Sequence, residues 1–318
     1  MPNAQSAVAP QISIQVLNFA QSADTWEPML DLVRLADRAG IDRLVLSDHI
    51  LYGERLEAYA DPSTGGSLGG KQPTTPDGHW LEPLTLLSLF AGITTRVRLG
   101  TAVLLAALRP GALLAKQLAT LDVMSGGRVD LGVGVGWQRE EYESCGLDFD
   151  TRGALLDHCL EVCQLLWTEQ VVDHAYDGVR LDRIHSMPKP LQPGGVPIWV
   201  SGRLHPRTVR RVARFGVGWI PWGDDVADPR PGIVAMREGL AAAGRDPSTL
   251  QVQGSLPLVR TESGVDIEAT VAAVPPLVAA GVTDLRVGRR WGADLAADAE
   301  LLERLVPAFR AAVGRGSE

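Results

Sequence analysis

The sequence predicts a (β/α)8 barrel, the TIM-barrel fold, as a single domain over residues 1–318. Strand and helix patterns alternate from one end of the chain to the other, with eight of each. Strands that are separated by helices form a parallel sheet, because a parallel connection needs a crossover. No shift in composition marks a linker. A plain barrel takes about 250 residues, so we expect the surplus to form insertions.

The first four units follow from apolar runs and helical periodicity. ISIQVLNF is typical of a strand, and the helix after it has apolar residues at spacings of three and four. Its expected N-cap is Asp24 or Thr25, and Gly40 is its expected end. The same reasoning predicts strands over 12–19, 43–48, 97–105 and 128–136, and helices over 26–40, 82–95, 110–127 and 152–168.

The last four units complete the barrel, and two insertions account for the surplus. Strands are expected over 197–202, 218–223, 250–258 and 284–288, and helices over 205–215, 231–244, 266–281 and 294–313. One insertion, residues 169–196, precedes strand five. The other, residues 51–81, is rich in Gly, Pro and Thr and follows strand two. Because active sites of such barrels lie at the C-terminal ends of the strands, we expect residues 51–81 to act as a lid.

Composition narrows the classes of function. The formal net charge of −8 argues against binding to nucleic acid or to an anionic membrane. No uncharged apolar span approaches the roughly 18 residues of a membrane helix, and MPNAQSAVAPQ at the N-terminus does not resemble a signal peptide. Cys159 and Cys163 share one helix face and are expected to be buried thiols, which favours a reducing cytoplasm. The six histidines show no metal-ligand spacing, so no metal site is predicted.

An acid and an imidazole stand where the second predicted strand ends. Ser47, Asp48 and His49 follow the apolar run of strand two and precede the insertion. An imidazole at this position can exchange a proton with a bound molecule near neutral pH. The alternative is structural, with His49 capping the strand and Asp48 accepting backbone N–H groups. His79, within the insertion, is also able to reach the site.

Other strand ends carry the features of a ligand pocket. Glycines at 132, 134 and 136 would let a flat ring or a phosphate approach the backbone, although their GxGxG spacing differs from the dinucleotide fingerprint. Strand five ends in SGR just before a helix, which is either a ready anion site or a simple β-to-α turn. Four tryptophans near the mouth suggest an aromatic pocket, namely Trp80, Trp137, Trp222 and Trp291.

Several segments together resemble the luciferase-like monooxygenase superfamily. They are LSDH, WLEPLTLLSLFAGITTRVRLGTAVLL, AKQLATLDVMSGGRVDLGVGVGWQREE, PIWVSG and GWIPWG, and the similarity runs from about Ile12 to the last helix. The sequence is most similar to the branch that uses the deazaflavin coenzyme F-420, and the long insertion also looks like that branch.

The resemblance implies roles for individual residues. His49 would face the reactive centre of the flavin or deazaflavin ring as a catalytic residue, and Asp48 would help to place it. A non-prolyl cis peptide is expected between Ala102 and Val103. SGRL departs from the usual phosphate turn of the family, and Arg203 would supply charge to the phosphate directly. The implied cofactor-binding residues are Ser47, Thr101, Ala102, Val103, Gly134, Gly136, Trp137, Ser201, Gly202, Arg203 and Trp222.

The resemblance also implies the reaction. The first hypothesis is hydride transfer between coenzyme F-420 and a small organic substrate, with His49 as proton donor or acceptor. The alternative is a monooxygenase that uses reduced FMN from a separate flavin reductase. A third hypothesis, from another class, is a barrel that binds a flavin or deazaflavin without catalysis. A homodimer is expected because relatives are often dimers, and no motif identifies the substrate.

Overall fold

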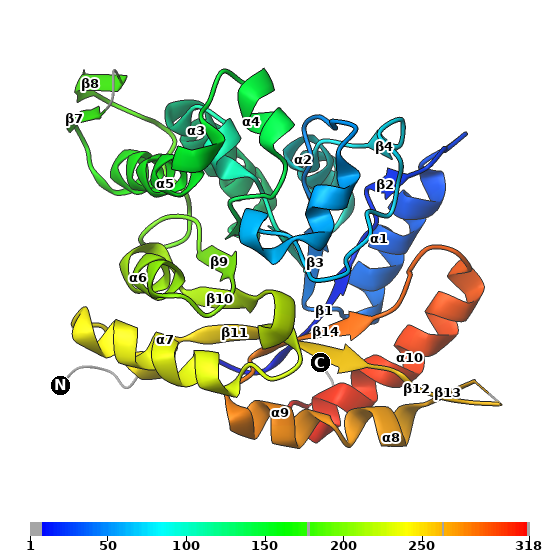
Figure 1. The fold of residues 1–318 in the computed structure, drawn as a ribbon. Helices are drawn as coiled ribbons and strands as arrows, with labels where there is room; N and C mark the ends of the chain where they lie inside the picture. Colours follow the sequence, from blue (N-terminus) through cyan, green and yellow to red (C-terminus); the bar gives the residue numbers. More distant parts are fainter. Residues whose placement is uncertain (1–7, 177–178, 263, 317–318) are drawn as a thin grey trace.

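The structure is a computed structural model that describes residues 8–176, 179–262 and 264–316. Eight parallel strands close into a barrel, in which β1 pairs with both β3 and β14 (Figure 1). Around the barrel, the strands are β1 (Gln11–Gln15), β3 (Arg43–Leu46), β5 (Arg98–Thr101), β6 (Val129–Val133), β9 (Ile198–Gly202), β10 (Gly218–Pro221), β11 (Gln251–Pro257) and β14 (Asp284–Gly288). All eight coincide with predicted strands, which confirms the (β/α)8 barrel. The first seven residues of the predicted leader lie outside the described part of the chain.

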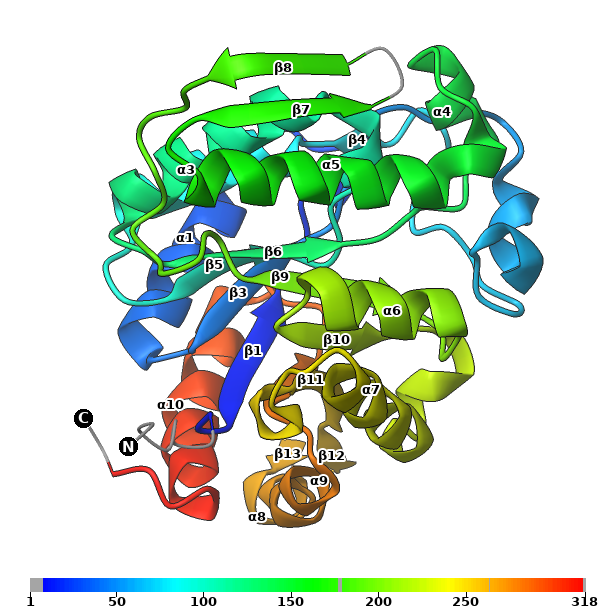
Figure 2. The ribbon, with the colours of Figure 1, turned by 90° about the vertical axis from the view of Figure 1, so that its left-hand side faces the viewer.

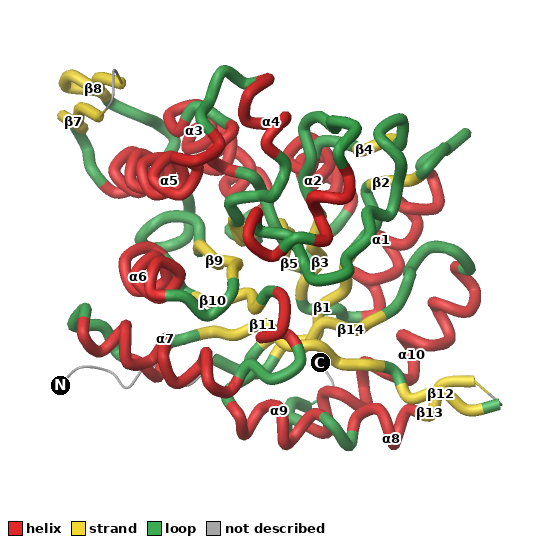
Figure 3. Tube along the Cα trace, in the orientation of Figure 1, coloured by secondary structure: helices red, strands yellow, loops and turns green. Residues whose placement is uncertain are grey.

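Helices surround the strands, as Figure 3 shows in red around yellow. They are α1 (Glu27–Ala39), α2 (Pro83–Ile93), α3 (Gly111–Ser125), α4 (Arg139–Ser144), α5 (Arg152–Thr168), α6 (Pro206–Phe215), α7 (Arg230–Ala242), α8 (Ile267–Val271), α9 (Val274–Ala280) and α10 (Leu295–Ala312). With helices outside and side chains filling the interior, strands such as β3 and β6 are buried at every residue, as parallel strands usually are.

Two helix predictions need correction. The helix expected over 266–281 is divided into α8 and α9, because Pro275 and Pro276 lack an N–H and occupy the start of a new helix. In α1 the N-cap is Trp26, not Asp24 or Thr25. Thr25 still contributes, since its Oγ1 accepts the N–H of Glu27 at 3.2 Å.

The first strand is shorter than predicted because the chain turns toward the insertion. Phe19–Ala20 forms β2, which pairs in antiparallel fashion with β4 (His79–Trp80). The buried Asn18 fixes this turn. Its Nδ2 donates to the carbonyls of Ser47 at 2.9 Å and Leu81 at 2.7 Å. One side chain thus ties the end of β3 to the end of the insertion.

Both insertions contain elements that the sequence did not predict. Residues 51–81 include the 3-10 turns η1 (Leu56–Ala60) and η2 (Pro62–Thr64) as well as β4. The second insertion forms a hairpin, β7 (Val172–Tyr176) with β8 (Val179–Ile184), that lies along α5 (Figure 2). A third hairpin, β12 (Val259–Thr261) with β13 (Gly264–Asp266), follows β11. Further 3-10 turns are η3 (Ala106–Leu108), η4 (Phe149–Thr151), η5 (Gly223–Val226) and η6 (Pro247–Thr249).

Ion pairs fill the interior at the N-terminal part of the strands. Arg43 donates to Asp130 and Asp284, each at 2.9 Å, and all three side chains are buried. Burial raises the pKa of Asp130, but Arg43 and Arg98 outweigh it and hold that pKa below its ordinary value. The interior is therefore a packed core, and ligand chemistry is left to the other end of the strands.

Two further observations bear on the predictions from composition. Cys159 and Cys163 are buried free thiols on α5, as expected, and Cys159 Sγ donates to the carbonyl of Ala106 at 3.4 Å. In the residues that the structure describes, no helix combines the length and the apolar character needed to cross a bilayer.

Candidate active site

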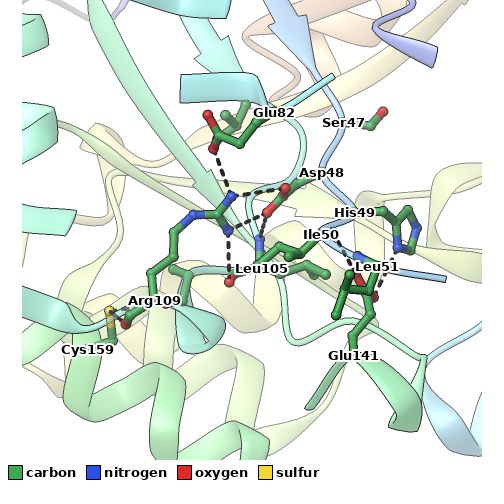
Figure 4. A network of polar contacts seen from close by, with 12 residues as sticks. Ser47, Asp48, His49, Ile50, Leu51, Glu82, Leu105, Arg109, Glu141 and Cys159 are labelled. Atoms are coloured by element: carbon green, nitrogen blue, oxygen red, sulfur yellow. Dashed lines mark hydrogen bonds and ion pairs between the residues drawn. The ribbon is translucent and has the colours of Figure 1, made fainter. Parts of the chain in front are cut away.

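The side chains of Asp48 and His49 point to opposite sides of the chain after β3 (Figure 4). His49 Nδ1 lies 3.0 Å from Glu141 Oε2, and Glu141 Oε1 accepts the N–H of Ile50 at 2.8 Å. We assign the Nδ1–H tautomer to His49, because an ionised carboxylate can only accept hydrogen bonds. In the neutral ring, Nε2 is then the acceptor. The arrangement is that of a base whose orientation a buried acid fixes, since the Glu141 side chain is only 1% exposed.

Glu141 is the functional candidate that the sequence prediction missed. It lies on α4, directly after the end of β6, and WQREE offers two adjacent acids at that place. Glu140 turns outward and pairs with Arg55 at the surface, whereas Glu141 turns inward to His49. An acid in the first helical turn after strand four indicates a candidate partner for His49. The sequence alone does not distinguish Glu140 from Glu141 in that role.

Asp48 does not hold the His49 ring, which corrects the expectation that it would. Its carboxylate accepts the N–H of Leu105 at 2.9 Å and both Nη atoms of Arg109, at 2.6 and 3.1 Å. Successive side chains of an extended segment point to opposite sides, so two neighbours cannot both face the mouth. Asp48 instead fixes the segment after β5.

Arg109 completes this buried network through Glu82 at the start of α2. Its Nη2 lies 2.9 Å from Glu82 Oε1. Burial lowers the pKa of Arg109, but the bonds to Asp48 and Glu82 outweigh it and raise that pKa above its ordinary value. Burial raises the pKa of Glu82, while the Thr85 amide and Arg109 more than offset this and leave it lowered. The ends of β3 and β5 and the start of α2 are thereby tied together.

Aromatic rings surround His49. Its ring centroid lies 4.5 Å from that of Tyr52, 4.8 Å from Trp80 and 6.0 Å from Trp137. The ring centroid of Tyr59 lies 5.4 Å from that of Trp137 and 6.2 Å from that of Trp222. Burial raises the pKa of both the Tyr52 and the Tyr59 hydroxyl, so these groups stay protonated at neutral pH. Three of the four tryptophans predicted at the mouth gather here, while Trp291 packs in the core beside Arg289.

The ends of β5 and β6 approach each other closely. The peptide between Ala102 and Val103 is cis, as the resemblance implied. Thr101 Oγ1 donates to the carbonyl of Gly132 at 2.7 Å. A Cβ on Gly132 would lie 2.0 Å from the Thr101 carbonyl oxygen, and one on Gly134 would lie 2.7 Å from Val103 Cγ2. At these two positions, therefore, the absent side chain makes room for the neighbouring strand end. The role of Gly134 in cofactor binding stays a prediction.

Gly136 and Ser47 have protein partners of their own. Gly136 adopts φ +69°, and a Cβ there would lie 3.0 Å from Leu105 Cδ2. Ser47 Oγ accepts from Gln15 Nε2 at 2.7 Å. These contacts explain the residue types at both positions, and their roles in cofactor binding stay predictions.

The turn after β9 presents an arginine. Arg203 packs on Gly223 at the end of β10, where a Cβ would lie 2.7 Å from its Nε. This Nε is buried and has no hydrogen-bond partner among the described residues. The nearby amides at the start of α6 are occupied, that of Leu204 by Asp225 Oδ2 and that of Arg207 by His205 Nδ1. The anion site predicted here thus depends on Arg203 rather than on these two amides.

Ser201 and Gly202 precede Arg203 in this turn. The carbonyl of Gly202 accepts from Trp219 Nε1 at 2.9 Å, and Ser201 is half-buried.

The insertion at 51–81 is attached to the barrel on two sides. Trp222 Nε1, after β10, donates to the carbonyls of Gly65 at 3.1 Å and Gly66 at 3.2 Å. Gln138, after β6, accepts the N–H of Gly53 and donates to the carbonyl of Leu51. In Figures 1 and 2 the insertion, in light blue, lies beside α4. It therefore contacts the segments after β6 and β10, two strands that β9 separates in the barrel.

Comparison with known proteins identifies the family. Residues 7–312 match the family model described as luciferase-like monooxygenase. The chain belongs to the luciferase-like monooxygenase family. Membership confirms the prediction of an enzyme, a flavin- or deazaflavin-dependent oxidoreductase, and extends over nearly the whole chain.

Individual relatives of this luciferase-like chain cover most of its length. An uncharacterized protein of Mycobacterium tuberculosis is 30% identical over 294 residues, which are 90% of this chain and 93% of the relative. The F420-dependent glucose-6-phosphate dehydrogenase of Nocardia farcinica is 30% identical over 240 residues, 72% of this chain and 64% of the relative. Among solved structures, monooxygenase RslO1 from Streptomyces bottropensis superposes with a TM-score of 0.73 at 20% identity, over 94% of this chain and 99% of that one. At that identity the superposition speaks for the fold alone.

Proposed function

We propose that this luciferase-like enzyme transfers a hydride between coenzyme F-420 and a small organic substrate, with His49 as the proton donor or acceptor. The observation that carries the proposal is the pair of His49 and Glu141 at the mouth of the barrel, 3.0 Å apart and surrounded by aromatic rings. A relative named as an F420-dependent dehydrogenase supports the choice of cofactor.

The residues at the mouth fit a ring with an anionic tail. Trp137 Nε1 and Arg203 Nε are both buried without a hydrogen-bond partner in the described part of the chain. A buried N–H without a partner costs about 1–3 kcal/mol, which a bound acceptor recovers. Arg203 would hold a phosphate, and Trp137 with the Ala102–Val103 segment would border the ring.

The chain's own residues manage the proton and exclude water. When bound, coenzyme F-420 supplies or accepts the hydride. His49 Nε2 takes up or gives the proton that accompanies it. The Glu141 carboxylate stabilises the imidazolium form, as a buried acid does in a catalytic triad. Tyr52 and Tyr59, which stay protonated, act as hydrogen-bond donors or as apolar walls but not as bases.

We further propose that residues 51–81 form a lid over this site. Support comes from the bonds of Trp222 and Gln138 to the insertion, because these residues lie in the segments that follow the barrel strands β10 and β6. A closed lid excludes water from the reacting groups. A homodimer, a reductase partner and a cytoplasmic location stay predictions from the sequence.

A binding titration separates the proposal from its rivals. Purified apoprotein is titrated with oxidised coenzyme F-420 and, separately, with FMN, and fluorescence quenching is followed. Preference for F-420 at micromolar concentrations supports hydride transfer. Preference for FMN indicates the monooxygenase with a separate reductase. Binding of either cofactor without turnover of any alcohol or activated alkene indicates a non-catalytic binding protein.

Substitution of His49 tests its role directly. His49→Ala is expected to lower turnover by about 10²–10⁴-fold, the usual contribution of general acid–base catalysis, while cofactor affinity persists. Steady-state kinetics and the same titration measure the two quantities. Unchanged turnover would remove His49 from the mechanism.

A further inference from the structure

A cluster of metal-ligand side chains lies outside the site described above. His158 and Glu161 stand three residues apart on α5, so they share one face of the helix. His174 comes from β7 of the hairpin that lies along this helix (Figure 2). One ligand atom from each of the three residues lies within 4.8 Å of the other two. The sequence did not predict this cluster, because the hairpin that brings His174 to α5 was not predicted.

We propose that His158, Glu161 and His174 bind a divalent transition-metal ion, with Zn²⁺ as the best fit. Two imidazoles and one carboxylate form a ligand set that suits Zn²⁺ and leaves a fourth position for water. Tetrahedral bonds of about 2.0–2.2 Å place ligand atoms about 3.3–3.6 Å apart. Small side-chain rotations therefore close the observed separation onto an ion.

Two contacts prepare the cluster for a ligand. His174 Nε2 is buried and has no hydrogen-bond partner among the described residues, so it keeps a lone pair or a proton that the protein does not use. Tyr176 stacks on His158 with ring centroids 4.0 Å apart. The stacking limits the orientations of the His158 ring, which lowers the entropy lost on binding.

The neighbouring charge sets the strength of the site. Glu161 Oε1 pairs with Arg214 Nη2 at 2.8 Å, which leaves the second carboxylate oxygen for an ion. Arg214 repels a cation, so the affinity is expected to be micromolar, below that of closed four-ligand sites. The bound ion would cross-link the β7–β8 hairpin to α5, which gives the metal a structural role separate from the redox site.

The experiment uses the tag-free full-length protein, stripped with chelator and titrated with Zn²⁺ by isothermal calorimetry. One ion is expected to bind per chain with a dissociation constant below about 100 µM, three partly exposed ligands being weaker than a closed site. His174→Ala and Glu161→Gln should each weaken binding by about tenfold or more. Zn²⁺ should also raise the melting temperature of the wild type but not of these variants.

Two further variants serve as a control and as an independent test of the proposed site. His185→Ala removes an exposed histidine of the same insertion and should bind Zn²⁺ like the wild type. Arg214→Met removes the competing cation and should bind more tightly. Circular dichroism verifies that each variant is folded. The proposal is overturned if the wild type shows no saturable binding in this range, or if both folded ligand variants bind like the wild type.

Discussion

The chemistry of the site depends on which nitrogen of His49 carries its hydrogen. The Glu141 carboxylate accepts the hydrogen on Nδ1 of His49. The ring is thereby oriented so that the lone pair of Nε2 points away from Glu141. The sequence predicted His49 but assigned its orientation to Asp48. Adjacency in sequence was misleading, because Asp48 and His49 face opposite sides of the same extended segment. The partner of His49 comes from another strand end, which only the folded barrel brings near.

Glu141→Gln tests this orientation at the scale of one atom. Glutamine has one acceptor oxygen and one donor NH2 group. If the oxygen keeps the Ile50 N–H, the NH2 group faces Nδ1, and the neutral ring must move its hydrogen to Nε2. We expect turnover to fall by about 10²–10⁴-fold, as when a triad acid becomes an amide, with little change in cofactor affinity.

The tautomer itself provides the readout for this variant. The ¹⁵N NMR shifts of the His49 ring should report Nδ1–H in the wild type and Nε2–H in Glu141→Gln. Glu140→Gln is the matched control, because that neighbour pairs with Arg55 at the surface. Wild-type turnover in Glu141→Gln would exclude Glu141 as the positioning residue.

At the scale of elements, the sequence located the barrel strands but not the hairpins. Barrel strands are covered on both sides and read as apolar runs, such as the fully buried β3. The β7–β8 hairpin is mostly exposed and carries no such run, since Leu181 is the one buried residue of β8. The break between α8 and α9 could have been predicted from Pro275 and Pro276. The apolar pattern continues through the break, however, and therefore predicted one helix.

Packing between the ends of β5 and β6 gives a prediction at this scale. In Gly134→Ala the new Cβ would lie 2.7 Å from Val103 Cγ2, and a valine has little rotamer freedom with which to yield. We expect a loss of about 1–3 kcal/mol in the free energy of unfolding, typical of overpacking, together with weaker cofactor binding. Urea denaturation measures the first quantity and fluorescence titration the second.

Gly92→Ala is the matched control for this substitution. Gly92 lies within α2, and a Cβ there meets nothing within 4 Å. Alanine in place of a helical glycine should stabilise the protein by about 0.5–1 kcal/mol. If Gly134→Ala were as stable as the wild type, Val103 would not be confined as described.

At the scale of the whole molecule, buried carboxylates link stability to pH. Asp37 accepts the amides of Thr95, Arg96 and Val97 at 2.8–3.0 Å, which joins α1 to the loop before β5. Burial raises the pKa of Asp37, but these hydrogen bonds outweigh it and leave that pKa lowered. The pKa values of Glu82 and Asp130 are lowered as well.

Acid should therefore destabilise the fold. A carboxyl group with a lowered folded pKa contributes its full stability above the unfolded pKa, about 4, and loses it as pH falls through the folded value. We expect the free energy of unfolding from urea titrations to be smaller at pH 3 than at pH 6. Asp37→Asn should lose about 1–3 kcal/mol at pH 6 and show a smaller drop toward pH 3. An equal drop in variant and wild type would contradict a role for Asp37.

The barrel as a whole was predictable because its signal is repeated. Eight alternations of strand and helix leave few topologies, so an error of a few residues at one boundary does not change the fold. The site lacks such redundancy. Its parts come from single loops after β3, β5, β6, β9 and β10, and their contacts depend on how the insertion at 51–81 packs against Gln138 and Trp222.

The closure of this insertion gives the last prediction. In Trp222→Phe the ring still packs near Tyr59, but the N–H that reaches the carbonyls of Gly65 and Gly66 is lost. One such hydrogen bond contributes about 0.5–1.5 kcal/mol, so the open state of the lid should become about 2–10 times more populated. Trypsin cleavage at the exposed Lys71 should accelerate by that factor, because cleavage follows the open population when closing is fast.

The substrate KM of Trp222→Phe should also rise in parallel with the cleavage rate, with kcat little changed. Trp26→Phe, at the start of α1, is the control for loss of an indole elsewhere. An unchanged cleavage rate in Trp222→Phe would mean that Gln138 and the other contacts hold the insertion without this bond.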